Sequence, residues 1–367
     1  MRESRTVRLA TRGSDLAMRQ ASAVESRLAD RRTEVELVAV ETRGDQLREE
    51  LIHRLGKTGA FVRALDERVI EGDCDAAVHS MKDVPTEFPG ELVVAGVPER
   101  APPHDVLVTP DGGSLPDLPE GAVVGTSSLR RTAQLLAERP DLEVEPLRGN
   151  VDTRVEKLLA PSRQREHERR MEAEEGDGAD GPDEAYDETV EEWFDGLAEI
   201  ERRALGRDPE VEFDAIVLAE AGLERIGLLP HVSYERLPVS RFVPAPGQGA
   251  LAVTALDGEF AEHLHDRVDH PRTRVETTVE RTVLETLGGG CIAPVGIHAT
   301  LRGEYVHAVV RVLSRDGTEE VSATRDLPGG DHAEAARAFA EDLADRGAAD
   351  LVEAARVREN EEREAPR

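Results

Sequence analysis

Five arginines occur where the sequence predicts the ends of strands, and together they could bind a ligand that carries several carboxylates. They are Arg12, Arg130, Arg131, Arg148 and Arg154. Small polar residues accompany them: Ser14, Thr126, Ser127, Ser128 and Asn150. Guanidinium groups bind carboxylates through paired hydrogen bonds, and helix starts add anion-binding N–H groups. Because the macrodipole disfavours cations at a helix start, the pair Arg130 and Arg131 favours ligand binding over an ordinary surface charge.

Lys82 and Asp83 form a second polar group, in the stretch AAVHSMKDVP. Lys82 stands out because the only lysines of the chain are Lys57, Lys82 and Lys157. Asp83 follows a predicted buried strand, and Pro85 prevents a helix from continuing there. A carboxylate in this position is suited to general acid/base chemistry or to stabilising a cation. A plain turn aspartate is the alternative interpretation.

Cys291 lies in the glycine-rich stretch LGGGCIAP. Three glycines free the backbone and Pro294 stiffens the exit, so the thiol could be an accessible nucleophile or an attachment point. A small residue in a tight turn is the alternative. Cys74 precedes a buried strand and is interpreted as structural. Two cysteines cannot form a disulfide framework, which indicates a reducing cytoplasm.

Several other motifs fail on inspection. GKTG lacks the first glycine of a phosphate loop, and GQGALA runs into a strand-like segment instead of a helix. His263, His265 and His270 lie in a segment that is charged all round, which predicts an exposed helix face. No metal site is expected.

The elements that must position these residues alternate between strands and helices. In the first hundred residues, strands are predicted at 6–11, 34–40 and 75–80, and helices at 14–30 and 61–72. In the next block, strands are predicted at 105–110, 122–128, 142–147 and 213–219, and helices at 129–139, 151–160 and 220–227. This rhythm is typical of mostly parallel sheets and predicts two α/β domains that face a cleft. Ligands of such sheets bind at the carboxyl ends of the strands, where the polar groups lie.

Two further regions complete the chain. Residues 162–211 are acidic and rich in glycine, which predicts a solvated, partly disordered insertion with a candidate surface helix at 194–205. From residue 267 on, a helix is predicted at 272–287, strands at 295–301, 305–313 and 321–327, and a covering helix at 332–347. This pattern predicts a small α+β domain.

The composition restricts the class of protein further. A net charge of −30, from 76 acidic and 46 basic residues, would repel nucleic acid. An acidic, lysine-poor surface is typical of a protein that stays soluble in concentrated salt, which favours a halophilic origin. No long apolar run or leader pattern occurs, and no heptad seam is evident. We therefore expect a cytoplasmic monomer that binds no membrane.

Seven motifs in order resemble the hydroxymethylbilane synthase (porphobilinogen deaminase) family. They are ATRGSDLA, HSMKDVP, GTSSLRRTAQL, LRGNVDTR, AEAGLERIGL, PAPGQGAL and GGGCIAPVG. The resemblance covers the chain from about Val7 to Gly347, apart from the insertion. It implies two domains similar to periplasmic solute-binding proteins, comprising 1–100 with 246–266 and 101–245, and a third domain at 267–367.

The resemblance also implies an activity and a cofactor. The family deaminates porphobilinogen and joins four molecules head to tail into a linear tetrapyrrole, with release of ammonia. A dipyrromethane cofactor is bound through a thioether to the cysteine of the glycine loop, here Cys291. Pyrroles that carry acetate and propionate groups fit a cleft rich in arginine.

Roles for individual residues follow from the same resemblance. Asp83 is the implied catalytic residue. The implied cofactor-binding residues are Lys82, Thr126, Ser128, Arg130, Arg131, Arg148 and Asn150. The implied substrate-binding residues are Arg12, Ser14, Gln20, Phe61, Arg148, Arg154, Arg225 and Gln248. Three departures from the family pattern are the insertion, Asp15 where proline is common, and Lys57, which is shifted by one place and receives no role.

Two other classes of protein remain open. A non-catalytic polycarboxylate-binding protein of the solute-binding type would explain the arginines and the sheets, but it leaves the glycine-loop cysteine and the third domain unexplained. A thiol-nucleophile transferase would use Cys291, but no histidine is clearly placed to activate it.

Overall fold

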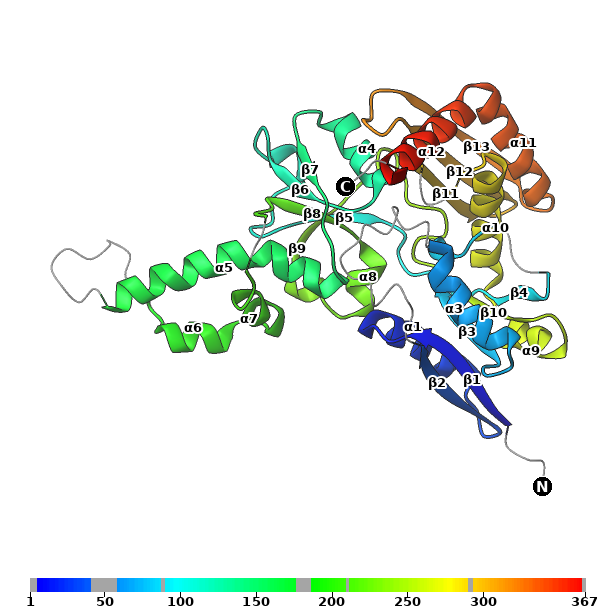
Figure 1. Ribbon diagram of the computed structural model, residues 1–367, viewed down its shortest axis with the longest axis horizontal. Helices are drawn as coiled ribbons and strands as arrows, with labels where there is room; N and C mark the ends of the chain where they lie inside the picture. Colours follow the sequence, from blue (N-terminus) through cyan, green and yellow to red (C-terminus); the bar gives the residue numbers. More distant parts are fainter. Residues whose placement is uncertain are drawn as a thin grey trace.

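The described strands of the computed structural model form three sheets (Figure 1). The structure describes residues 5–40, 58–86, 90–175, 186–208, 211–289 and 293–364. The α/β architecture and the small C-terminal sheet expected from the sequence are confirmed. None of the described helices is long and apolar enough to cross a membrane.

The first sheet has the order β2-β1-β3-β10-β4. Its strands are β1 (Arg5–Arg12), β2 (Thr33–Val40), β3 (Ala76–Ser80), β4 (Leu92–Gly96) and β10 (Leu251–Leu256). Helices α1 (Asp15–Leu28) and α9 (Glu259–Val268) share one core with Leu9, and α3 (Thr58–Ile70) shares another with Ala10. Because neighbouring residues of a strand point to opposite faces, the helices cover both sides of this sheet.

The second sheet has the order β7-β6-β8-β5-β9. Its strands are β5 (Asp105–Thr109), β6 (Val123–Gly125), β7 (Glu143–Glu145), β8 (Ala215–Ala219) and β9 (Ser233–Arg236). Helix α4 (Leu129–Glu138) packs on the face that includes Leu107, whereas α5 (Val151–Glu175) and α8 (Glu220–Arg225) pack on the face that includes Val106. Short 3-10 turns lie at Leu115–Asp117 and Leu229–His231.

The expectation of mostly parallel sheets is only half right. β1 pairs in parallel with β2 and β3, and β6 pairs in parallel with β7 and β8. By contrast, β10 is antiparallel to β3 and β4, and β5 is antiparallel to β8 and β9. β5 and β10 are the strands at which the chain enters one sheet from the other, so no helical crossover sets their direction.

The third sheet is antiparallel and has the order β11-β12-β13. Its strands are β11 (Val295–Arg302), β12 (Tyr305–Leu313) and β13 (Glu320–Pro328). Helices α10 (Pro271–Thr286) and α11 (His332–Asp345) cover it, as expected. A further helix, α12 (Ala348–Glu364), was not expected from the sequence, because its second half is strongly charged and only its first half adds buried residues such as Val352.

The described part of the insertion is largely helical, so the prediction of a solvated loop is wrong for residues 162–175 and 190–196. α5 continues to Glu175, and α6 (Val190–Gly196) and α7 (Glu199–Leu205) follow. Figure 1 shows these helices projecting away from the rest of the molecule. Ile200 and Ala204 of α7 are buried in the core of the second sheet, which explains why that candidate helix forms.

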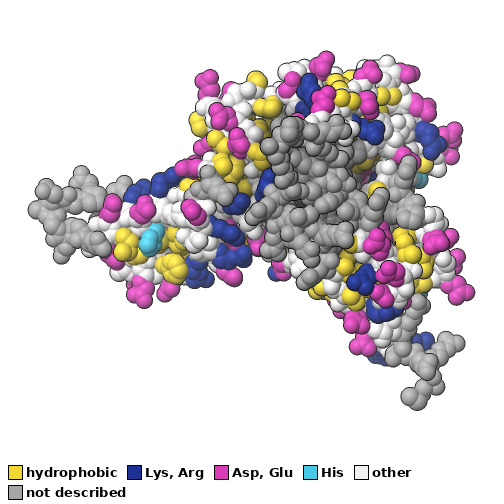
Figure 2. All heavy atoms as spheres, in the orientation of Figure 1, with side chains coloured by type: hydrophobic (Ala, Val, Ile, Leu, Met, Phe, Trp, Pro, Cys, Tyr) yellow, Lys and Arg dark blue, Asp and Glu magenta, His cyan; other side chains and the backbone are white. Residues whose placement is uncertain are grey.

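The end of α5 was not predicted from apolar spacing, because it is stabilised by charged side chains and has no apolar stripe. Glu166 pairs with Arg169 and Arg170 at helical intervals. The guanidinium of Arg170 also lies over the rings of Tyr186 and Trp193. Such pairs stabilise a polar helix without an apolar stripe. Figure 2 shows acidic side chains spread over the visible face, with basic side chains gathered over α5 and α7.

Candidate active site

The segment that carries Lys82 and Asp83 is a short turn, and backbone hydrogen bonds hold both its first residue and the residue that follows it. It forms the 3-10 helix Met81–Asp83, directly after β3. The Met81 N–H donates to the carbonyl oxygen of Ala250 at 3.0 Å, and the Val84 N–H donates to that of Met81 at 3.1 Å. Gly247, with φ of +73°, lies so close that a Cβ there would be 2.5 Å from Met81 Cγ. The half-buried Asp83 is therefore presented on a packed scaffold.

Three cations from three different elements are close enough to perturb one another: Lys82, Arg131 of α4 and Arg154 of α5. Although the Lys82 side chain reaches solvent, desolvation lowers its pKa, Arg131 and Arg154 lower it further, and Asp83 opposes the shift. Desolvation and Arg131 lower the pKa of Arg154 to about 10. Such a concentration of positive charge in a protein of net charge −30 suits a ligand with carboxylates.

Asp105, which the sequence analysis did not single out, holds both members of the arginine pair. Arg130 Nη1 donates to Asp105 Oδ2 at 2.6 Å and to the Val243 carbonyl oxygen at 2.8 Å. Arg131 Nε donates to Asp105 Oδ1 at 3.0 Å, and its Nη1 donates to the Val217 carbonyl oxygen at 3.0 Å. The Asp105 carboxylate is fully buried, and the pKa of this group is lowered because the two guanidiniums outweigh its desolvation. A carboxylate at the start of a buried apolar strand was the feature of the sequence that could have identified Asp105 as a buried ion-pair partner.

The hydroxyl residues mainly shape the turns before the helices. Ser14 caps α1 by accepting a hydrogen bond from the Ala17 N–H at 3.3 Å. Ser128 occupies the same position before α4, and its N–H donates to Thr126 Oγ1 at 3.3 Å. Ser127 Oγ donates to the Leu147 carbonyl oxygen. These contacts fix the conformation of the chain at the starts of α1 and α4.

Arg148, Asn150 and Arg154 lie around the start of α5. Gly149, with φ of +115°, makes the turn between them possible. Arg154 Nε donates to the Gly149 carbonyl oxygen at 2.8 Å, and the Arg154 N–H donates to that of Asn150. Arg148 is half-buried and forms no hydrogen bond or ion pair within the described part of the chain. Arg12 is half-buried at the last position of β1.

Other predicted site residues lie elsewhere or outside the described residues. Arg225 donates to the Gly249 carbonyl oxygen at 2.6 Å and lines a pocket of about 310 Å³ between α1, α8 and residues 98–102. Gln20 is buried on α1. The side chain of Phe61, in α3, and the whole of Cys291 lie outside the described residues, as does Lys57. The exposed helix face expected for the histidines is confirmed for His263 and His265, which are exposed on α9, whereas His270 is half-buried and caps α10.

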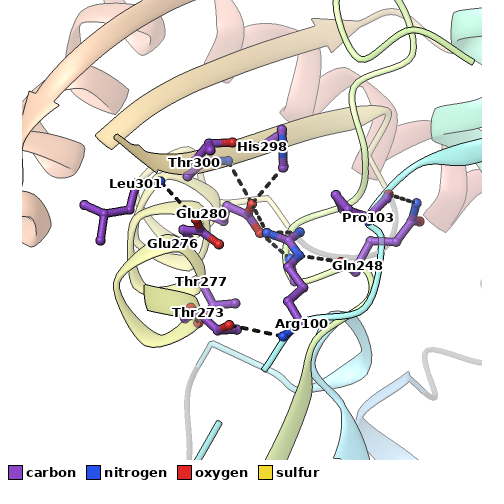
Figure 3. A network of polar contacts seen from close by, with 12 residues as sticks. Arg100, Pro103, Gln248, Thr273, Glu276, Thr277, Glu280, His298, Thr300 and Leu301 are labelled. Carbon is purple, nitrogen blue, oxygen red and sulfur yellow. Dashed lines mark hydrogen bonds and ion pairs between the residues drawn. The ribbon is translucent and has the colours of Figure 1, made fainter. Parts of the chain in front are cut away.

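Gln248 belongs to a buried polar network that joins the three sheets at the crossing between them (Figure 3). Its Nε2 donates to the Pro103 carbonyl oxygen at 2.6 Å and to Asp105 at 2.9 Å. Its own carbonyl oxygen accepts from Arg100 Nε at 2.7 Å. Arg100 in turn forms paired bonds to Glu280 of α10, at 2.7 and 3.1 Å. Arg100 and Glu280 were not anticipated from the sequence, since nothing in it shows that residues 180 positions apart meet.

Glu280 should be a major determinant of stability in mild acid. Its pKa is lowered to about 2, because Arg100 and His298 together outweigh its desolvation. A carboxyl group whose folded pKa lies below its unfolded value stabilises the fold at higher pH. That stability should fall as the pH drops from about 5 towards 2. Replacing Glu280 with glutamine should lower the free energy of unfolding at neutral pH by about 3–5 kcal/mol, because the buried Arg100 loses its partner. It should also flatten the acid dependence, measured by denaturant unfolding at a series of pH values.

Glu334→Gln, an exposed position in the first turn of α11, is a suitable control and should retain the wild-type pH profile. A Glu280→Gln variant with wild-type stability at every pH would contradict this role.

Comparison with known proteins assigns the chain to a family. The model described as "Porphobilinogen deaminase, dipyromethane cofactor binding domain" matches residues 7–165 and 198–262. A second, "Porphobilinogen deaminase, C-terminal domain", matches residues 275–345. The residues between the first two matched ranges contain most of the insertion, so the end of α5 and all of α6 lie outside the family pattern.

Named relatives agree with these matches. A "Probable porphobilinogen deaminase" of Halobacterium salinarum is 55% identical over 392 aligned residues, which cover 96% of this chain and 99% of the relative. A protein of the same name from Methanococcoides burtonii is 38% identical, with coverage of 95% and 96%. Among solved structures, the ectoine-binding protein TeaA covers 71% of this chain and 74% of its own at 10% identity, but its TM-score of 0.33 supports no argument. On the family models and the curated relatives, this chain belongs to the porphobilinogen deaminase family.

Proposed function

We propose that this protein is a hydroxymethylbilane synthase, a transferase of tetrapyrrole biosynthesis. It deaminates four molecules of porphobilinogen and condenses them head to tail into the linear tetrapyrrole, with release of ammonia. The observation that carries this function, beside the family membership, is that Lys82, Arg131 and Arg154 are near enough to shift one another's pKa values next to Asp83. The substrate and the growing chain carry an acetate and a propionate on every ring, and such a cluster suits them.

The same cluster fits the dipyrromethane cofactor of the family. Guanidinium and ammonium groups whose pKa values are lowered by one another are stabilised by a carboxylate ligand, because it restores the charge balance. We assign its carboxylates to Lys82, Arg131, Arg148 and Arg154, and its thioether bond to Cys291. Thr126, Ser128 and Asn150 support these residues through the turns that they form. When bound, the cofactor supplies the pyrrole carbon to which the first substrate unit is joined.

Asp83 is the proposed catalytic residue. Loss of ammonia from porphobilinogen leaves a methylene-pyrrole cation, and a carboxylate nearby stabilises that charge. After the new carbon–carbon bond forms, a proton must leave the attacked ring, and Asp83 is suited to accept it. Lys82 supplies a neighbouring positive charge that holds a carboxylate of the bound pyrroles. Arg12, Ser14, Gln20, Phe61 and Arg225 remain proposed substrate-binding residues.

The contacts of Gln248 and Arg130 favour a supporting role for these two residues. Gln248 uses both side-chain ends within the buried network, and Arg130 is directed towards Asp105 and Val243. We propose that both act by holding Arg131 and the crossing segments in place.

We also propose a domain division and a cellular setting. The first domain comprises 1–100 with 246–266, the second 101–245 and the third 267–367; membership of β10 in the first sheet supports this division. The acidic, lysine-poor composition and the relative from Halobacterium salinarum support a halophilic origin. We propose a cytoplasmic monomer.

Intact mass spectrometry tests the proposal directly. The purified protein should be heavier than its sequence by one dipyrromethane, and incubation with porphobilinogen should release ammonia and the linear tetrapyrrole. A Cys291→Ser variant should lack both the additional mass and the activity, because no thiolate remains to hold the cofactor. Cys74→Ser is the matched control, since Cys74 is buried in the first domain, and it should keep both. An unmodified mass together with no turnover would refute the synthase and leave the solute-binding alternative.

A further inference from the structure

Arg281 of α10 contacts the backbone immediately after Asp83. Its Nη1 donates to the Val84 carbonyl oxygen at 2.8 Å, and its Nη2 donates to the Pro85 carbonyl oxygen at 2.6 Å. One planar guanidinium thus spans two consecutive carbonyls, a geometry that fixes both position and orientation. Arg281 is half-buried, and desolvation lowers its pKa, with Glu285 opposing.

The exit of the Asp83 turn is held by this contact together with apolar packing, because Val84 is buried in a cluster with Met81 and Val97. The entry of the turn is held by the bond from Met81 to Ala250. On the exit side, a pocket of about 200 Å³ lies against α10, lined by Met81, Thr86, Arg281 and other residues. Arg281 lines this pocket and provides the polar link between α10 and the carbonyl oxygens of Val84 and Pro85.

The helix that provides Arg281 is itself held in place by the preceding residue. Glu280 accepts from the Gly247 N–H at 2.6 Å and from the Ala299 N–H at 2.8 Å, and it pairs with Arg100 (Figure 3). Glu280 and Arg281 therefore tie the same turn of α10 to the crossing segment, to β11 and to the Asp83 turn. α10 ends at Thr286, five positions before Cys291 in the sequence.

We propose that Arg281 is a positioning residue that sets the Asp83 turn relative to the helix leading to Cys291. It acts through the backbone of Val84 and Pro85. This inference rests on the proposed function, because it assigns Asp83 the chemistry and Cys291 the attachment. A misplacement of a reacting group by about 1 Å can lower a rate by about 10²-fold, so a link of this kind affects the rate more than substrate affinity.

The test compares Arg281→Met with Arg272→Met, a control on the same helix. Arg272 donates to the carbonyl oxygen of Leu301 within the third sheet, away from the Asp83 turn. Hydrogen exchange measured by mass spectrometry should show faster exchange at residues 78–86 in Arg281→Met and unchanged exchange there in Arg272→Met. For protein that carries the cofactor mass, kcat should fall about 10- to 100-fold in Arg281→Met, whereas KM should stay within about threefold. Arg281→Lys, which can reach only part of the contact, should recover part of both properties.

The outcomes separate this inference from the function on which it rests. Wild-type exchange at residues 78–86 together with wild-type kcat in Arg281→Met would overturn the positioning role. The same holds for a change of KM alone, or for a loss of melting temperature that Arg272→Met shares. If Arg281→Met does not fold, the exchange and the kcat of Arg281→Lys decide the question in the same way. A wild-type enzyme that releases no ammonia would instead refute the proposed function, while the exchange comparison would still test the contact.

Discussion

Replacing Asp83 by alanine should lower the turnover of porphobilinogen by about 10²- to 10⁴-fold, the range that general acid–base and electrostatic contributions commonly supply. The variant removes the only carboxylate of the Met81–Asp83 turn, which lies beside Lys82 and in electrostatic contact with it. Steady-state assays of tetrapyrrole formation measure the effect. Asp83→Glu keeps the charge but moves the carboxylate along the side chain, so it should also lose most of the turnover.

The fold should survive these substitutions, because Asp83 is half-buried and its turn is held by backbone bonds of Met81 and Val84. Circular dichroism and the melting temperature check this point. Asp111→Ala, an exposed turn residue after β5, is the control and should keep full turnover. Normal rates in both Asp83 variants would remove this residue from its proposed role.

Asp105→Asn should lower the free energy of unfolding by about 3–5 kcal/mol. The Asp105 carboxylate is fully buried between two buried guanidiniums, Arg130 and Arg131, and also accepts from Gln248. Asparagine retains the shape but leaves two positive charges without a counter-charge in a dry environment. Denaturant unfolding measures the loss, in concentrated salt if the variant requires it.

The same substitution should also reduce the fraction of protein that carries the cofactor, because Arg131 loses the group that orients it. Intact mass gives this fraction. Asp141→Asn is the matched control, since Asp141 pairs with Arg139 at a partly exposed position and should cost less than about 1 kcal/mol. An Asp105→Asn variant as stable as Asp141→Asn would show that the arginine pair does not depend on this carboxylate.

Local sequence determined most elements and much of the site. The apolar runs that became β1, β3, β5 and β8, and the cap at Ser14, depend on neighbouring residues alone, so their pattern was sufficient. The cation cluster was predictable for a related reason. Lys82 lies in the turn after β3, and Arg131 and Arg154 lie near the starts of α4 and α5, so all three are expected near the carboxyl ends of strands.

Tertiary structure decided which of these groups meet, and which are already occupied. The sequence showed Arg130 and Arg131 as neighbours, but only the tertiary structure shows that both are buried and share Asp105, from a distant segment. The helices of the insertion could not be predicted fully for a similar reason. The long helix α5 is stabilised by charge pairs and by the burial of α7, and neither produces an apolar period in the sequence.

What the sequence by itself determined about this protein is therefore its family, its strands and helices, and the residue types that could do the chemistry. Only the tertiary structure decided that Arg100 and Glu280 join the sheets, that Asp105 holds the arginine pair, and that Arg281 supports the Asp83 turn. The physical reason is that an ion pair or a backbone contact depends on distance in space. A carboxylate and a guanidinium separated by more than a hundred residues leave no local pattern that identifies them as partners.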